Sequence, residues 1–183
     1  MKGKILITGG AGFIGSVISS YLSDNGYELA VVDDLSTGHK EVVDKRATFY
    51  QGSILDKSFL INALDGIDTV IHCAAKSLVD ESVKNPELYD EVNVQGTKVL
   101  LDVMKQLGIN KIIFSSTAAV YGDTKTQPIS EGSVLTAVNP YGQSKIKCEE
   151  EISKRIASTQ GRPSSTSGPC KTKRRQRWAS RGS

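Results

Sequence analysis

The sequence predicts an α/β fold built on a doubly wound parallel sheet. Short apolar runs rich in β-branched residues alternate with segments whose apolar residues repeat at helical spacing. The apolar runs lack the apolar–polar alternation of a half-exposed strand, which is typical of strands buried on both faces. Strands that alternate with helices form right-handed βαβ units, and successive units give a parallel sheet between helices.

The elements can be placed in order along the chain. Strands are expected over residues 5–7, 29–32, 48–50, 69–71 and 112–114. Apolar residues repeat at helical spacing over 17–22, after Gly15, and Gly26 ends that segment. The same spacing recurs over 94–104, where Gly108 marks the end of a second helix. No internal repeat of fixed period interrupts this alternation.

The composition of the chain changes near Ala157. The first 155 residues carry 16 Lys and Arg against 20 Asp and Glu, whereas the last 28 carry seven basic residues and no acidic one. Those 28 residues include 14 Ser, Thr, Gly or Pro and only five apolar residues, too few to offset the entropy of ordering them. We expect an incomplete globular domain over 1–157 and a disordered basic tail over 158–183. The abrupt change resembles a shifted reading frame.

The hydrophobic runs and the cysteines indicate in which cellular compartment the protein is found. No run of about 18 apolar residues occurs, so no membrane-spanning helix is expected. The apolar run at residues 5–7 is too short for a signal peptide. Cysteines at 73, 148 and 170 form no CxxC pair, which disfavours a disulfide framework or a zinc site and favours a reducing compartment. We expect a cytoplasmic protein.

A glycine cluster lies between the first expected strand and the first helix. Gly9, Gly12 and Gly15 are spaced G-x-x-G-x-x-G, a variant of the dinucleotide-binding motif of Rossmann-type sheets. Gly9 permits the tight turn, Gly12 lets the backbone approach a pyrophosphate, and Gly15 allows close packing of helix and sheet. A Gly-rich turn without a ligand is the plainer alternative, but the strand–turn–helix context favours dinucleotide binding.

An acidic residue follows the second expected strand. Asp33 lies 18 residues beyond Gly15, where a carboxylate can accept both hydroxyls of the adenosine ribose and repel a 2′-phosphate. Asp34 follows, and no Lys or Arg occurs before Lys40. NAD is therefore favoured over NADP. The alternative is that Asp33 and Asp34 only begin a surface turn.

A third pattern combines Tyr141 and Lys145. Residues four apart share one face of a helix, so the phenol and the ammonium can point into one site. A tyrosine hydroxyl is a weak base near neutrality, and a neighbouring cation favours its phenolate form. A hydroxyl of Ser115, Ser116 or Thr117, after the last expected strand, can hydrogen-bond a substrate oxygen whose proton the nearby Tyr removes. On its own, the Tyr141–Lys145 spacing fits an exposed tyrosine and a solvated lysine, and the Ser/Thr run fits a polar strand end. Together with the glycine cluster, the two patterns predict a catalytic site.

These segments resemble the extended short-chain dehydrogenase/reductase family, and within it the nucleotide-sugar 4-epimerases. The resemblance runs from residue 4 to about 159 and is carried by ILITGGAGFIGS at 5–16, VVDDLSTGH at 31–39, HCAAKSLVDESVKNP at 72–86, VNVQGT at 92–97, IIFSSTAAVYGD at 112–123 and NPYGQSKIKCEE at 139–150. It implies a Rossmann fold, bound NAD and a UDP-sugar substrate, with no membrane and a homodimeric full-length protein. Family members continue into a C-terminal substrate domain, which the sequence after Gln160 does not resemble.

The resemblance also implies roles for particular residues. Thr117, Tyr141 and Lys145 are implied to be catalytic. Ser53 stands where the family usually has an acid. The implied cofactor-binding residues are Gly9, Gly12, Phe13, Ile14, Gly15, Asp33, Asp34, Leu35, Ser36, Thr37, Gly38, Ser53, Ile54, Cys73, Ala74, Ala75, Lys76, Ser77, Asn93, Thr117, Tyr141 and Lys145.

The implied reaction interconverts UDP-galactose and UDP-glucose. Tyr141 takes the proton of the sugar 4-hydroxyl while a hydride passes to NAD and later returns to the other face of a 4-keto sugar. A 4,6-dehydratase is an alternative, although Ala118 and Ala119 stand where those enzymes carry an Asp–Glu pair. Other nucleotide-sugar epimerases also remain alternatives. In a different class, the chain is an inactive NAD-binding fragment whose basic residues 171–178 bind nucleic acid, although a solvated tail is favoured.

Overall fold

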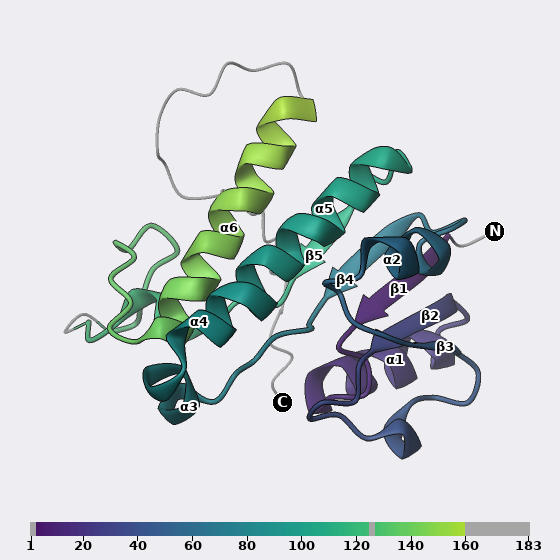
Figure 1. The fold of residues 1–183 in the computed structure, drawn as a ribbon, viewed down its shortest axis with the longest axis horizontal. Helices are drawn as coiled ribbons and strands as arrows, with labels where there is room; N and C mark the ends of the chain where they lie inside the picture. The colour runs from purple at the N-terminus through teal and green to yellow at the C-terminus, as the bar shows by residue number, and fades with distance from the viewer. Residues whose placement is uncertain (1–2, 125–126, 160–183) are drawn as a thin grey trace, which may run out of the picture.

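The computed structural model describes residues 3–124 and 127–159 of the 183-residue chain. Its centre is a parallel sheet of five strands in the order β3-β2-β1-β4-β5 (Figure 1). The doubly wound sheet and its five strands are confirmed, each within a residue or two of its predicted bounds. The strands are β1 (Lys4–Thr8), β2 (Glu28–Asp33), β3 (Thr48–Gln51), β4 (Thr69–His72) and β5 (Ile112–Phe114).

Each pair of successive strands is connected through at least one helix, as parallel neighbouring strands require a crossover connection. The helices are α1 (Phe13–Asp24), α2 (Lys57–Ala63), α3 (Val79–Lys84), α4 (Pro86–Tyr89), α5 (Gly96–Gln106) and α6 (Pro140–Thr159). Two short 3₁₀ helices, η1 (Lys40–Val42) and η3 (Ala118–Tyr121), and a π-helix, η2 (Asp90–Gln95), complete the described elements. The π-helix runs directly into α5, and such segments occur frequently at functional sites.

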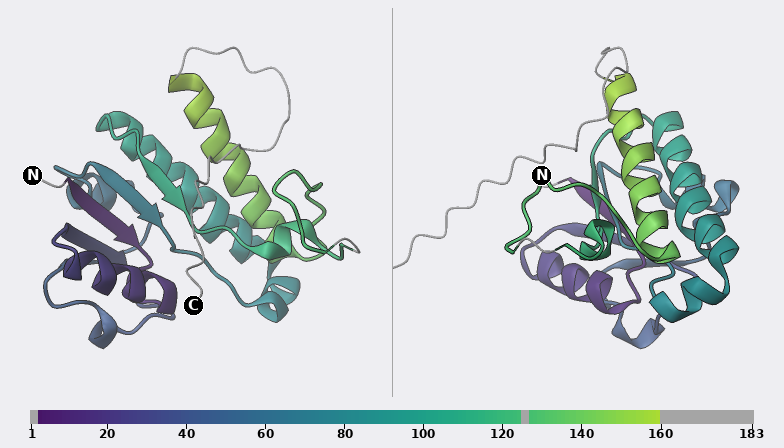
Figure 2. Two further views of the ribbon diagram at one scale, coloured as in Figure 1. Left: turned by 180° about the vertical axis from the view of Figure 1, so that it is seen from behind. Right: turned by 90° about the vertical axis from the view of Figure 1, so that its left-hand side faces the viewer.

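Helices cover both faces of the sheet. The helices α2, α5 and α6 pack on one face, with α5 and α6 side by side, and α1 packs on the other (Figures 1 and 2). Strand residues alternate between the two cores: Leu6, Val32 and Val70 contact the first set of helices, whereas Ile7 and Val31 face α1. Every one of these five side chains is fully buried, as the sequence pattern predicted for a two-faced sheet.

The α1 helix uses only part of its apolar pattern for the core. Ile18 and Leu22 pack against the sheet, but Val17 and Tyr21 are 56% and 67% exposed. On the same face, Ile113 of β5 is 59% exposed, because within residues 3–124 and 127–159 no helix lies over that part of the sheet. The helix predicted over 17–22 is confirmed, and only one side of it is buried.

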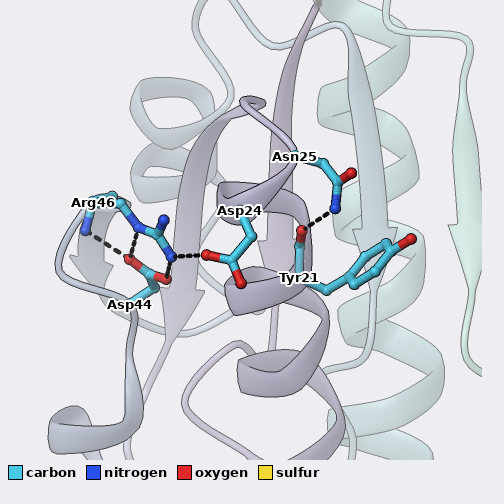
Figure 3. Close-up of polar contacts among 5 residues, drawn as sticks. All are labelled: Tyr21, Asp24, Asn25, Asp44 and Arg46. Atoms are coloured by element: carbon cyan, nitrogen blue, oxygen red, sulfur yellow. Dashed lines mark hydrogen bonds and ion pairs between the residues drawn. The ribbon is translucent and has the colours of Figure 1, made fainter.

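An ion-pair cluster ties the end of α1 to the segment before β3 (Figure 3). The Arg46 guanidinium donates to Asp24 at 2.8 Å and to both carboxylate oxygens of Asp44, at 2.9 and 2.6 Å. This guanidinium lowers the pKa of Asp44 to about 2. Beside it, the Asn25 amide donates to the Tyr21 carbonyl and helps to close the helix. The cluster lies at the end of the sheet opposite the glycine turn.

The last described element is α6, which ends at Thr159. Near its end, the Ser158 hydroxyl donates to the Arg155 carbonyl at 2.7 Å. The predicted tail from residue 160 onward, with its basic run at 171–178, lies outside the described residues. Within the described ranges, no helix has the length and apolar character needed to span a membrane.

Candidate functional site

A groove of about 390 Å³ crosses the carboxyl ends of the strands. In doubly wound sheets, ligands bind beyond these strand ends, at the point where the strand order reverses. Here that point lies between β1 and β4, since β2 and β3 extend the sheet to one side and β4 and β5 to the other. Most of the predicted site residues line this groove: Gly9, Gly12, Phe13, Ile14, Gly15, Asp33, Asp34, Ser36, Thr37, Gly38, Ile54, Cys73, Ala74, Ala75, Lys76, Ser77, Tyr141 and Lys145.

The glycine turn forms one wall of the groove. Gly9 has a φ of +69°, a conformation that favours glycine, and its N–H donates to the Val32 carbonyl at 2.8 Å. A Cβ on Gly15 would lie 2.3 Å from the Gly9 carbonyl oxygen, so only glycine lets α1 approach the turn. At Gly12, the N-cap of α1, only the Gly9 carbonyl oxygen lies within 4 Å of the Cβ position. A ligand can therefore approach this backbone closely.

Asp33 shapes the far end of the groove. Its carboxylate is buried and accepts hydrogen bonds from the Ala11 and Leu35 amides, each at 2.9 Å. Leu35 adopts the left-handed conformation, with φ +59°. Each carboxylate oxygen has one protein partner and retains a further lone pair for a ligand hydroxyl. Asp33 thus holds the turn and faces the groove at the same time.

The loop after β4, residues 73–77, forms the floor of the groove. Asn93 holds it from behind: its side-chain oxygen accepts from the Lys76 amide at 2.8 Å, and its side-chain nitrogen donates to the Lys76 carbonyl at 3.0 Å. Asn93 is 1% exposed and does not line the groove. Burial raises the pKa of the Cys73 thiol, although the Lys145 charge opposes this shift.

Lys145 lies at the other end of the groove and is 3% exposed. Its ammonium donates to the Ser115 carbonyl at 2.9 Å and lies 4.6 Å from the centre of the Phe114 ring. Burial lowers the pKa of Lys145, while the nearby thiols of Cys148 and Cys73 and the Glu149 carboxylate oppose this shift. The charge of Lys145 is therefore fixed at the carboxyl end of β5 and cannot swing into solvent.

Tyr141 begins α6, one helical turn before Lys145. Its ring meets the Tyr89 ring edge-on, with centroids 6.3 Å apart and an interplanar angle of 79°. Tyr89 is fully buried and its hydroxyl donates toward the Leu78 carbonyl and the Glu81 carboxylate. Burial, and then the hydrogen bond with Glu81, raise the pKa of Tyr89 to about 12. The sequence analysis missed Tyr89, which packs beside Tyr141.

Thr117 lies at the start of η3 and does not line the groove. Its hydroxyl accepts from the Ala119 amide at 3.2 Å and caps this short turn. The turn packs against α6 at Gly142, where a Cβ would lie 2.7 Å from the Ala119 carbonyl oxygen. Glycine beside Tyr141 therefore brings α6 close to the turn that Thr117 begins.

Four predicted residues lie beside the groove without lining it, and each has a local partner. Leu35 and Asn93 are bonded as described above, Thr117 caps η3, and the Ser53 hydroxyl accepts from the Leu55 amide at 3.2 Å. Conversely, the groove is also lined by five residues that were not among the predicted cofactor-binding residues: Val32, Gly52, Val92, Ser115 and Ser116. The Ser116 hydroxyl donates to the Glu149 carboxylate.

The donor set fits an extended ligand with phosphates near its middle. The open backbone at Gly12 and the N-terminus of α1 suit a pyrophosphate, the Asp33 carboxylate suits ribose hydroxyls, and Lys145 with Tyr141 lies at the opposite end. These are the parts of a dinucleotide site. The residues present therefore fit NAD.

Comparisons with known proteins agree with this reading. The family model described as "NAD dependent epimerase/dehydratase family" matches residues 5–180. The UDP-glucose 4-epimerase of Streptomyces lividans is 43% identical over 161 residues, which are 86% of this chain and 49% of that protein.

Two solved structures are also similar. The UDP-glucose 4-epimerase from Brucella ovis in complex with NAD has a TM-score of 0.83 at 39% identity, over 87% of this chain and 49% of that one. The UDP-glucose 4-epimerase from Thermotoga maritima with UDP-glucose has a TM-score of 0.81 at 37% identity, over 87% of this chain and 52% of that one. The chain spans about half the length of the relatives it matches.

Proposed function

Because the chain belongs to the NAD dependent epimerase/dehydratase family, we propose that it is the NAD-binding half of a UDP-glucose 4-epimerase, which interconverts UDP-galactose and UDP-glucose. One observation carries the proposal: a single groove joins the glycine turn and Asp33 at one end to Tyr141 and Lys145 at the other. The named relatives, each a UDP-glucose 4-epimerase, support the choice of this activity within the family.

The residues divide along the groove by the part of NAD that they hold. Asp33 accepts the hydroxyls of the adenosine ribose, and the backbone from Gly12 to Phe13 meets the pyrophosphate. The loop at 73–77 supports the nicotinamide half, and Lys145 lies beside it. Asp33 and Asp34 together repel a 2′-phosphate, so NAD is preferred to NADP.

The chemistry lies at the Tyr141 end. When bound, NAD supplies a reversible acceptor for the hydride at the sugar 4-carbon. Tyr141 removes the proton of the 4-hydroxyl, and Thr117 hydrogen-bonds the same oxygen. The buried ammonium of Lys145, fixed by the Ser115 carbonyl, favours the phenolate form of Tyr141. Ala118 and Ala119 supply no acid after Thr117, so the site lacks the side chain that a dehydratase uses for loss of water.

The substrate on this proposal is a UDP sugar, and the setting is galactose metabolism in the cytoplasm. Cys73 and Cys148 are free thiols, which suits a reducing compartment. Positioning of the sugar requires contacts remote from the reacting carbon, because binding energy from those contacts orients the substrate. We place these contacts in the half of the relatives that this chain does not span. The chain alone therefore converts UDP-galactose slowly or not at all.

A test is to join residues 1–159 to the C-terminal half of the Streptomyces lividans relative and to measure conversion of UDP-galactose. Tyr141→Phe lowers turnover by orders of magnitude while NAD remains bound, whereas the matched control Tyr21→Phe, on the exposed face of α1, does not. Equal turnover of Tyr141→Phe and the parent would show that another group is the base. Fast turnover by the 183-residue chain itself would show that the remote contacts are not required.

A further inference from the structure

A buried histidine lies beneath the floor of the groove, outside the proposed chemistry. His72 ends β4 and is 1% exposed. Its Nδ1 lies 2.7 Å from the Thr8 hydroxyl at the end of β1, and its Nε2 lies 3.0 Å from the Thr97 hydroxyl in α5. Both threonines are fully buried. The imidazole thus bridges β1 and α5.

The neighbours of the two threonines limit the directions that these bonds can take. The Ala74 amide donates to the Thr8 hydroxyl at 3.3 Å, and the Thr97 hydroxyl donates to the Asn93 carbonyl at 2.6 Å. An amide N–H only donates and a carbonyl only accepts, and each hydroxyl has one proton. Because the Thr97 proton goes to the Asn93 carbonyl, Nε2–H must donate to Thr97. In a neutral ring Nδ1 then carries no proton and accepts from the Thr8 hydroxyl. A neutral imidazole protonated at Nε2 therefore satisfies all four bonds and gives the Thr8 proton an acceptor.

Two further features agree with a neutral ring. Burial, and then the positive charge of Lys145, lower the pKa of His72 to about 3. The other titratable group at this network is Cys148, whose Sγ lies 3.4 Å from the Thr97 hydroxyl and donates to the Asn93 carbonyl at 3.3 Å. Burial raises the pKa of that thiol, so it stays protonated as a donor.

The bonds form a closed ring around the groove loop. From His72 the ring runs through Thr97 to Asn93, whose side chain holds both backbone groups of Lys76. On the other side it runs through Thr8 to the Ala74 amide. The loop at 73–77 has no regular secondary structure, so these two anchors, at Ala74 and Lys76, fix the backbone that faces the groove.

We propose that His72 is a positioning residue whose neutral, Nε2-protonated imidazole closes this ring and holds the loop at 73–77 in the conformation that contacts NAD. The contact with NAD rests on the proposed function, whereas the ring and its tautomer rest on the geometry alone. An apolar side chain could fill the same space, but it would leave the Thr8 hydroxyl buried without an acceptor.

The first test is the tautomer itself. Long-range ¹H–¹⁵N NMR spectra of the 183-residue chain at neutral pH distinguish the two ring nitrogens of His72. The ring predicts an unprotonated Nδ1 and a protonated Nε2. A protonated Nδ1, alone or together with Nε2, would overturn the proposal. If His72 only filled space in the core, the protonation of its two ring nitrogens would not be restricted to this tautomer.

The second test removes single hydroxyls and measures NADH binding to the same chain by fluorescence titration. Thr8→Val and Thr97→Val keep the side-chain shape, and Thr8→Ser and Thr97→Ser keep the hydroxyl. Each valine variant weakens NADH binding about tenfold and each serine control by less than about threefold, the scale of one buried hydrogen bond.

The affinities are compared at a temperature at which every variant is fully folded, and thermal unfolding curves verify this. Valine and serine variants with equal affinities would overturn the proposal. If the parent chain bound no NADH, the proposed function would fail instead, and the NMR result would still decide the tautomer and the ring.

Discussion

Substitution of Asp33 separates the structural role of this carboxylate from its role toward NAD. In Asp33→Ala, the Ala11 and Leu35 amides each lose a charged acceptor at 2.9 Å. A hydrogen bond to a charged group contributes roughly 1.5–3 kcal/mol, and a buried donor left unpaired costs a similar amount. Ala11 is buried, but Leu35 is half-buried and water can replace part of its bond. We expect the free energy of unfolding without NAD to fall by roughly 2–4 kcal/mol.

The measurement is urea unfolding followed by circular dichroism. Asp33→Asn keeps one acceptor oxygen and should lose about half as much stability. Asp34→Ala is the matched control, since Asp34 is exposed and its carboxylate accepts from the nearby Ser36 amide at 2.9 Å. The control should change the unfolding free energy by less than about 1 kcal/mol. Equal unfolding midpoints and slopes for Asp33→Ala and Asp34→Ala would refute the reasoning. In the folded protein, Asp33→Ala should also weaken NAD binding by roughly 1–3 kcal/mol.

Three further predictions concern the glycine turn, His72 and Lys145. Gly15→Ala should lower the free energy of unfolding by roughly 1–3 kcal/mol or more, because the new Cβ would lie 2.3 Å from the Gly9 carbonyl oxygen. Gly132→Ala is the control, since nothing lies within 4 Å of its Cβ position. Equal melting temperatures for the two variants would contradict this prediction. Because the pKa of His72 is about 3 when folded and near 6.5 when unfolded, the unfolded chain binds the extra proton below pH 6.5, and stability should fall by about 2 kcal/mol between pH 7 and pH 5. That loss should disappear in His72→Gln, and an unchanged pH profile would exclude His72 as its source. Lys145→Met should change the free energy of unfolding by less than about 1 kcal/mol, because removal of a buried charge offsets loss of the hydrogen bond to the Ser115 carbonyl. The same variant should weaken NADH binding at least about tenfold. An unchanged affinity in an NADH titration would contradict this expectation for binding.

The parts of the fold that the sequence predicted well are those set by neighbouring residues. The β-rich runs, the turn at Gly9 and the approach at Gly15 depend on local backbone conformation, and Asp33 follows its strand directly. Their places in the chain therefore determine their places at the groove. Val17 and Tyr21 fit the same helical pattern as Ile18 and Leu22, and pattern alone could not show that the sheet covers only one side of α1.

The parts that sequence reasoning missed depend on contacts between distant segments. His72 meets a partner 64 residues away, and Tyr89 meets Tyr141 only after α4 and α6 pack together. The need for glycine at Gly142 arises from the Ala119 carbonyl, which lies 23 residues earlier in the chain. The contacts of Asn93 with the Lys76 amide and of Thr117 with the Ala119 amide were likewise not evident from the sequence.

The central claim is that this groove binds NAD, with Asp33 and Asp34 excluding the 2′-phosphate of NADP. Its most direct test is calorimetric titration of the purified 183-residue chain with NAD and, separately, with NADP. The account predicts saturable binding of one NAD per chain and at least about tenfold weaker binding of NADP, the effect of placing a phosphate beside two carboxylates. Equal affinities for the two cofactors, or no binding of NAD by folded protein, would contradict it.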